Sequence, residues 1–328
     1  MRPYWSLSAA GGFLLDWDGV IADTKLDFSG IREKYYGGRR AMLLEEAHTL
    51  PPEKQEELNR DLIELEMAGA DRATAVPGAF RLISLLQENG IPFCILSRNC
   101  MDVIRRGAEV IGLELPEHHV WGRDNMEYLK PDPRALTSAA EKTGAPAHSC
   151  IYVGDFLYDL QGARRAGMRG VLVQRDEREW ECWADVIFPK MTDLVKAFEE
   201  KKEYIPWEYR ELYAAKGAAW LERACSCTFA LPEDPLPDAA SWLLRAAELG
   251  IGSFSVSAER VFSPGDWKAS PSFDTASMGF TWAETVSSFI APRFPQVTVM
   301  SSGASALPAP ADASALDDYI AGIVRGNG

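Results

Sequence analysis

The feature that most constrains the fold is a regular alternation between residues 12 and 173. Short apolar runs alternate there with stretches that have the 3.6-residue periodicity of amphipathic helices. This pattern is typical of parallel strands joined by crossover helices. The runs cover residues 13–15, 91–96, 119–121, 150–153 and 170–173. We therefore predict an α/β fold with a doubly wound, Rossmann-like parallel sheet.

Two of the expected helices have readable ends. Asp102 is in a position to cap a helix that stops at Gly112, because a short acidic side chain accepts bonds from free N–H groups and glycine ends helices readily. Asp132 is expected to cap a second helix, with Pro133 at its first position and Gly144 at its end.

The segment 25–75 interrupts the alternation. It contains helical stretches, including one from Pro52 to about Ala68, and no strand-like run. It follows the first strand directly, so we interpret it as a small helical cap over the carboxyl edge of the sheet, where open α/β sheets bind ligands.

The composition changes after residue 198, where a charged and then aromatic passage is followed by a Pro-rich acidic one at 231–238. At 328 residues the chain is longer than one compact core usually requires. Residues 204–328 are predicted to form a small C-terminal α/β region, beginning with a helix at 207–223. The domain scheme is thus a core at 1–24 and 76–203, a cap at 25–75, and the C-terminal region at 204–328.

The first apolar run ends in the letters DWDGV, which place Asp16 and Asp18 where a strand meets a glycine-bearing loop. Two aspartates with this spacing also occur in ordinary solvated turns. The second strand ends in ILSRN, so Ser97, Arg98 and Asn99 should reach the same edge of the sheet. Such groups can bind phosphate oxygens, although a loop with only local backbone hydrogen bonds has a similar composition.

Two further groups follow later strands. Lys130 precedes the helix that Pro133 opens, where its ammonium can lie near the anion-favouring helix start, or be an ordinary surface charge. Asp155 and Asp159 follow the strand at 150–153, four residues apart, and could also be simple N-terminal helix charges. Four such signals, each at the carboxyl end of a strand, favour one shared site over four separate turns.

The segments DWDGV, ILSRN, KPDP and GDFLYD together resemble the four motifs of the haloacid dehalogenase-like superfamily, in the usual order. The resemblance covers about residues 12–200. The insertion after the first motif is similar to the cap of the phosphoglycolate phosphatase-like branch, in a version of about 50 residues. The resemblance implies a Mg²⁺-dependent phosphatase that acts on a small phosphorylated metabolite.

The resemblance also implies a role for each residue. Asp16 would be the nucleophile that forms an aspartyl-phosphate, and Asp18 the general acid and base. Asp16, Asp155 and the backbone carbonyl of Asp18 would bind Mg²⁺, a cation suited to oxygen ligands. Ser97 and Lys130 would stabilise the transferring phosphoryl group, with Asn99 and Arg98 as further substrate-binding residues. Asp159 would orient its neighbours.

Other interpretations keep the scaffold or change the class of protein. Phosphoryl transfer to a second hydroxyl, as in a mutase, or dehalogenation could use the same fold. Dehalogenation is disfavoured, because members of that branch lack the second aspartate, which is present here as Asp18. A regulatory or binding protein, with its biological role in residues 204–328, is the alternative from another class.

Composition excludes several partners. The formal net charge of −14 and the isoelectric point near 4.9 argue against a nucleic-acid surface. The N-terminal sequence lacks the apolar region of a signal peptide, and no stretch is apolar enough to predict a membrane span. The expected location is therefore the cytoplasm. The six scattered cysteines suit reduced thiols better than disulfides. A protein partner or a second copy of the chain, bound through 204–328, is the remaining expectation.

Overall fold

The computed structural model describes residues 3–39, 41–44, 46–115, 119–232, 234–301, 306–308, 310 and 312–326. These residues divide into two compact units, one spanning Ala10–Glu200 and the other combining Met1–Ala9 with Lys201–Gly328. The sequence-based scheme places residues 1–9 with the core. In the structure they group with the C-terminal unit, because β1 (Trp5–Ser6) pairs antiparallel with β10 (Glu203–Tyr204).

The unit Ala10–Glu200 contains a six-stranded parallel sheet with the order β6-β5-β2-β7-β8-β9. Its strands are β2 (Gly12–Leu15), β5 (Phe93–Leu96), β6 (Val120–Trp121), β7 (Cys150–Gly154), β8 (Arg169–Val173) and β9 (Val186–Phe188). Strands β2, β5, β7 and β8 are buried along their whole length, as expected of apolar strands covered on both faces. The doubly wound α/β prediction is therefore confirmed, and β9 is a short edge strand that was not predicted.

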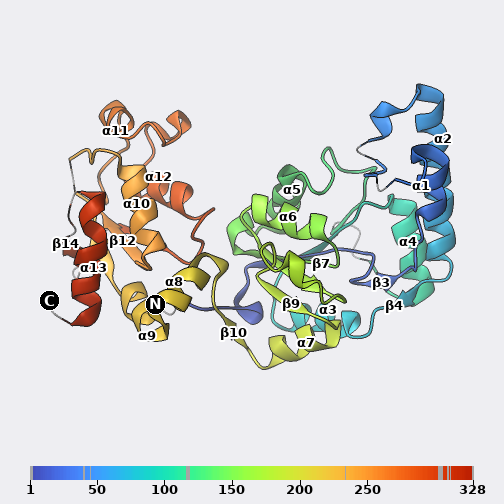
Figure 1. The fold of residues 1–328 in the computed structure, drawn as a ribbon, viewed down its shortest axis with the longest axis horizontal. Helices are drawn as coiled ribbons and strands as arrows, with labels where there is room; N and C mark the ends of the chain where they lie inside the picture. The colour runs from blue at the N-terminus through green and yellow to red at the C-terminus, as the bar shows by residue number, and fades with distance from the viewer. Residues whose placement is uncertain are drawn as a thin grey trace. The chain divides into compact units, whose positions relative to one another are not determined.

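Helices cover both faces of this sheet. Figure 1 shows α5 (Pro133–Thr143) and α6 (Leu157–Arg165) on one face, and α3 (Ala79–Glu88) and α7 (Met191–Glu199) on the other. Asp132 caps α5 as predicted, since its carboxylate accepts a hydrogen bond from the backbone N–H of Arg134, and α5 ends at Gly144. The predicted cap at Asp102 is wrong. The cap of helix α4 (Met101–Ile111) is Cys100, two residues before Asp102, which leaves Asp102 within the first turn.

The predicted cap after the first strand is present. It contains α1 (Ser29–Tyr36), a 3₁₀ turn (Ala47–Thr49) and α2 (Pro52–Ala70), with a small core of its own that includes Ile31, Leu58 and Leu62. The expectation that 25–75 contains no strand is wrong. Thr74–Ala75 forms β4, which pairs antiparallel with β3 (Ala22–Asp23) where the chain enters and leaves the cap. A two-residue strand is too short to show a periodicity in the sequence.

The second unit has a four-stranded parallel sheet with the order β13-β12-β11-β14. The strands are β11 (Thr228–Ala230), β12 (Ser253–Val256), β13 (Thr298–Ser301) and β14 (Leu307–Pro308); the helices are α8 (Arg210–Lys216), α9 (Ala218–Cys225), α10 (Ala239–Glu248), α11 (Pro264–Ala269), α12 (Trp282–Ile290) and α13 (Leu316–Arg325). The predicted C-terminal α/β region is thus confirmed. The single helix expected at 207–223 is divided between α8 and α9 at Gly217, whose φ of 80° is incompatible with a continuous helix.

All six cysteines are free, and those at positions 94, 100, 150 and 225 are buried. Within the described part of the chain, none of the helices combines the length and the apolar character that crossing a membrane requires.

Candidate active site

The predicted site residues meet at the carboxyl edge of the six-stranded sheet. Asp16 follows β2, Ser97 follows β5 and Asp155 follows β7. The chain leaves β2 toward β5 on one side and leaves β7 toward β8 on the other, so the connections diverge between these two central strands. A crevice forms where connections diverge, and open α/β sheets bind their ligands there.

Lys130 is buried beside the first aspartate. Its ammonium lies 2.8 Å from Asp16 Oδ1 and 3.0 Å from Asp159 Oδ1, and it donates a hydrogen bond of 2.7 Å to the hydroxyl of Tyr152. Burial by itself would lower the pKa of Lys130, but the charges of Asp159 and Asp16 raise it above its usual value. The side chain is therefore a fixed positive charge against Asp16.

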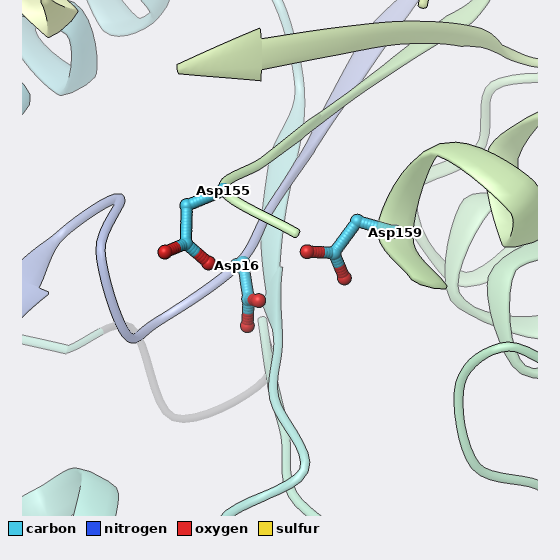
Figure 2. A group of neighbouring side chains, drawn as sticks. All are labelled: Asp16, Asp155 and Asp159. Atoms are coloured by element: carbon cyan, nitrogen blue, oxygen red, sulfur yellow. The ribbon is translucent and has the colours of Figure 1, made fainter. Parts of the chain in front are cut away.

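Three carboxylates converge next to this lysine. Oxygens of Asp16, Asp155 and Asp159 all lie within 4.8 Å of one another, and Figure 2 shows the carboxyl groups turned toward a common space. Asp16 and Asp155 come from the ends of strands, whereas Asp159 is in the first turn of α6. Gly154 is needed between them, because a Cβ there would lie 2.3 Å from the Cβ of Asp159.

The pKa values of this cluster show how poorly its charges are balanced. Burial and the neighbouring Asp159 raise the pKa of Asp155 to about 6. The guanidinium of Arg175, whose Nη2 lies 3.2 Å from Asp155 Oδ2, opposes this rise. Burial also raises the pKa of Asp16, against the opposing charge of Lys130. Oxygen donors held together at such an unfavourable cost are typical of a site for a hard divalent cation.

Asp18 lies apart from that cluster and is held by two donors. The Thr24 hydroxyl donates to its Oδ1 at 2.5 Å and the Asn99 amide donates to its Oδ2 at 2.7 Å. Burial raises the pKa of Asp18, while these two hydrogen bonds lower it. The raised pKa makes this carboxyl easier to protonate than one in water, and the two hydrogen bonds fix its position.

Ser97 and Asn99 are both almost fully buried, and the Ser97 hydroxyl oxygen accepts a bond of 3.1 Å from the Asn99 backbone N–H. Together with Arg98 they line a cavity of about 540 Å³ that is also lined by Asp16, Asp18, Lys130 and Asp155. The structure thus brings all the predicted site residues to one cavity.

The cap supplies the opposite wall of the cavity. Phe28, Leu43, Leu44 and Leu62 give it an apolar surface, and Arg32 adds a cation. The cavity therefore combines charged groups at the sheet edge with an apolar region under the cap, as expected of a site for a small organic anion.

Several residues of the site were not predicted. Thr24, Glu66, Tyr152, Arg123 and Arg175 each contact a predicted residue or one another. Only Tyr152 had a signal in the sequence, since it places a phenol in the apolar run that precedes Asp155. Thr24 lies only six positions from Asp18 but belongs to none of the motifs, and the other three residues depend on contacts between distant segments.

Comparisons with known proteins agree with this geometry. The haloacid dehalogenase-like hydrolase family model matches residues 11–167. The chain is 24% identical over 201 residues to pyrophosphatase PpaX of Halalkalibacterium halodurans, covering 56% of this chain and 94% of the relative. It is 26% identical over 208 residues to phosphoglycolate phosphatase of Caulobacter vibrioides, covering 56% of this chain and 88% of the relative.

The fold comparison covers a similar share of the chain. A hydrolase from Pseudomonas syringae superposes with a TM-score of 0.51 at 24% identity, covering 58% of this chain and 98% of that protein. The family model, the order of the motifs and their convergence on one cavity all agree. Residues 11–167 are therefore a haloacid dehalogenase-like hydrolase domain, which makes the protein an enzyme with phosphatases among its relatives.

Proposed function

We propose that the enzyme is a Mg²⁺-dependent phosphomonoester hydrolase that acts through an aspartyl-phosphate on Asp16. The observation that carries this proposal is the placement of Asp16 and Asp18 in one cavity with different surroundings. Asp16 lies against Lys130 and two further carboxylates, whereas Asp18 lies between two neutral donors. Two carboxyl groups in unlike environments are suited to the separate roles of nucleophile and proton carrier.

In the first step a carboxylate oxygen of Asp16 attacks phosphorus, and the bond from phosphorus to the leaving oxygen breaks. Asp18, whose pKa is raised by burial, gives its proton to that leaving oxygen. In the second step Asp18 takes a proton from water, the water oxygen attacks phosphorus, and the bond to Asp16 breaks. The products are an alcohol and inorganic phosphate, and both aspartates return to their starting states.

The carboxylate cluster fits a divalent cation. Asp16 and Asp155 would supply carboxylate oxygens, and the backbone carbonyl of Asp18 a third oxygen, which is a suitable set for Mg²⁺. When bound, the cation would neutralise charge on the phosphoryl oxygens. Asp159 is better suited to orientation, since its oxygens already accept bonds from Lys130 and from the Phe156 backbone N–H at 3.2 Å.

The remaining polar groups would stabilise charge on the phosphoryl group as it is transferred. Lys130 is buried and charged, and Ser97 offers a hydroxyl at the same edge of the sheet. Such preorganised donors provide most of the catalysis in phosphoryl transfer. Arg98 and Asn99 line the same cavity, which supports their proposed contact with substrate. The relatives hydrolyse phosphate bonds according to their names, which supports the same reaction class here.

The test is an assay of p-nitrophenyl phosphate hydrolysis with Mg²⁺ or with excess EDTA, followed by a screen of phosphorylated metabolites. The Asp16→Asn variant serves as the blank, because it removes the nucleophile with little change in volume. We expect Mg²⁺-dependent turnover that falls by roughly a thousandfold or more in this variant. Full activity in EDTA, or an Asp16→Asn variant within about tenfold of wild type, would contradict the mechanism.

A further inference from the structure

A buried ion pair connects the cap to the core beside the active site. Glu66 lies on α2 of the cap, and Arg123 lies on the loop that follows β6. Arg123 Nη1 is 2.8 Å from each of the two Glu66 oxygens, and the side chains of Arg123 and Glu66 are only 8% and 6% exposed. Most other ion pairs of the cap are exposed, for example the pair between Lys34 and Glu57.

Arg123 also holds the backbone of a catalytic loop. Its Nη1 donates to the carbonyl oxygen of Arg98 at 3.1 Å, and its backbone N–H donates to the carbonyl oxygen of Asn99 at 2.9 Å. Gly122 permits this approach, because a Cβ there would lie 2.7 Å from that same Asn99 oxygen. Arg123 therefore fixes two successive carbonyl groups of the loop that follows β5.

The fixed loop in turn holds the proposed proton carrier. The Asn99 side chain donates to Asp18 Oδ2 at 2.7 Å, so a continuous set of contacts runs from Glu66 through Arg123 and Asn99 to Asp18. The other oxygen of Asp18 is held by Thr24, which directly follows β3 at the entrance to the cap. One oxygen of Asp18 is thus held by the loop that Arg123 contacts, and the other by a residue at the entrance to the cap.

Stability alone is a poor explanation for such a pair. Burying two charges removes both of them from water at a large cost, and apolar residues of similar volume in place of a buried pair often give equal or greater stability. A buried pair does, however, specify geometry, because an arginine held at both carboxylate oxygens has little freedom.

We propose that Glu66 and Arg123 are positioning residues for proton transfer by Asp18. The pair sets the backbone of the loop at Arg98 and Asn99, and so holds the Asp18 carboxyl where it can reach the leaving oxygen. It does this only while α2 of the cap is in contact with the core. This inference rests on the proposed role of Asp18.

The proposal predicts an effect that depends on the leaving group. An alkyl alcohol is a poor leaving group and needs a proton from Asp18, whereas nitrophenolate leaves without one. Misplacing Asp18 should therefore slow hydrolysis of an alkyl phosphate far more than hydrolysis of p-nitrophenyl phosphate. A general loss of folding would reduce both rates by the same factor.

The experiment measures kcat for both substrates in wild type, Glu66→Gln, Asp18→Asn and the double variant. We expect Glu66→Gln to lower the alkyl phosphate rate by about tenfold or more and the nitrophenyl rate by about threefold or less. In the Asp18→Asn background the same change should have almost no further effect on the alkyl rate, because the group that it positions is already gone. Glu57→Gln removes a half-buried carboxylate of α2 that pairs with Lys34, and it should leave both rates within about twofold.

Equal losses on the two substrates, no loss on either, or losses that multiply with those of Asp18→Asn would each overturn the positioning role. If Glu66→Gln does not fold, Arg123→Lys replaces it, because lysine keeps the charge but lacks the planar guanidinium whose Nη1 lies between Glu66 and the Arg98 carbonyl. We expect Arg123→Lys to change the ratio of the alkyl phosphate rate to the p-nitrophenyl phosphate rate in the same direction. The wild-type and Asp16→Asn assays test the proposed function separately. The proposed function and the positioning role can therefore fail independently of each other.

Discussion

The buried ammonium of Lys130 shows how single residues determine this site. It has three N–H donors, and the structure gives it three acceptors, namely Asp16, Asp159 and the hydroxyl of Tyr152. The Tyr152 hydroxyl then donates to the carbonyl oxygen of Leu96 at 3.2 Å. A buried charge is tolerable only when its donors are satisfied, so the phenol both supports the lysine and limits its movement.

Tyr152→Phe should therefore weaken both stability and catalysis. Removing the hydroxyl leaves one N–H of Lys130 and the Leu96 carbonyl without this partner, which should lower the free energy of unfolding by about 1–3 kcal/mol. The kcat for p-nitrophenyl phosphate should fall as well, because the ammonium is less well fixed against Asp16. Chemical denaturation and steady-state assays measure the two effects. Tyr128→Phe, at a half-buried tyrosine outside the cavity lining, is the control. Wild-type values for both quantities in Tyr152→Phe would show that the phenol is dispensable.

Arg32 suggests a preference among substrates. It lies half-buried on α1 and lines the cavity; its Nε is buried, and among the described residues no hydrogen-bond partner reaches that atom. Arginine readily binds carboxylate or phosphate groups. We expect Arg32→Gln to lower kcat/KM by about tenfold for substrates with an anionic leaving portion, and hardly at all for p-nitrophenyl phosphate.

The matched control for this change is Arg39→Gln, since Arg39 is a cap arginine that pairs with Glu46 and does not line the cavity. Rates should be compared for 2-phosphoglycolate and ethyl phosphate, which differ in the distal charge. If the ratio of kcat/KM for 2-phosphoglycolate to kcat/KM for ethyl phosphate is the same in wild type and in Arg32→Gln, Arg32 has no role in recognising that charge.

At the scale of elements, the sequence was informative where burial is continuous. The strands at 150–153 and 170–173 were found because their apolar runs are covered on both faces, and the residues that follow the strands gave Asp16, Ser97 and Asp155. Strands β4 and β9 have only two and three residues, so their pairing depends on neighbours and not on a pattern. The pair of Glu66 and Arg123 was missed for the same reason, since its members lie 57 positions apart.

The turn from β7 into α6 gives a prediction at this scale. Gly154→Ala would place a Cβ within 2.3 Å of Asp159, so the start of α6 must shift away from the strand. We expect a loss of about 1–3 kcal/mol in the free energy of unfolding and a strong loss of activity, because Asp155 and Asp159 move with the turn. Gly30→Ala on α1, where nothing lies within 4 Å of the added atom, should be neutral or stabilising by up to about 1 kcal/mol. Thermal and denaturant unfolding compare the two, and an unchanged Gly154→Ala variant would contradict the packing described here.

At the scale of the whole molecule, the charge imbalance of the site should link stability to metal binding. A ligand that binds only the folded state raises its stability in proportion to the logarithm of its concentration. We therefore expect Mg²⁺ to raise the Tm relative to EDTA in wild type but not in Asp155→Asn, which lacks one proposed ligand. Asp102→Asn removes an exposed carboxylate and should keep the full response. The same rise of the Tm in Asp155→Asn as in wild type would show that the ion binds elsewhere.

Ca²⁺ should inhibit the hydrolysis, since it takes more ligands at longer distances than Mg²⁺ does.

The two units suggest a division of labour that a truncated chain can test. Among the residues that the structure describes, those that line the cavity all fall within 10–200, which also has its own buried core. The truncation should begin at residue 10, because β1 pairs with β10 and belongs to the other unit. We expect residues 10–200 to retain Mg²⁺-dependent hydrolysis of p-nitrophenyl phosphate. The C-terminal unit would then act in partner binding, self-association or choice of substrate. A metabolite screen of the full-length chain beside the truncated chain tests whether it affects the choice of substrate. A truncated chain that is folded by circular dichroism but lacks all turnover would show that the C-terminal unit takes part in catalysis.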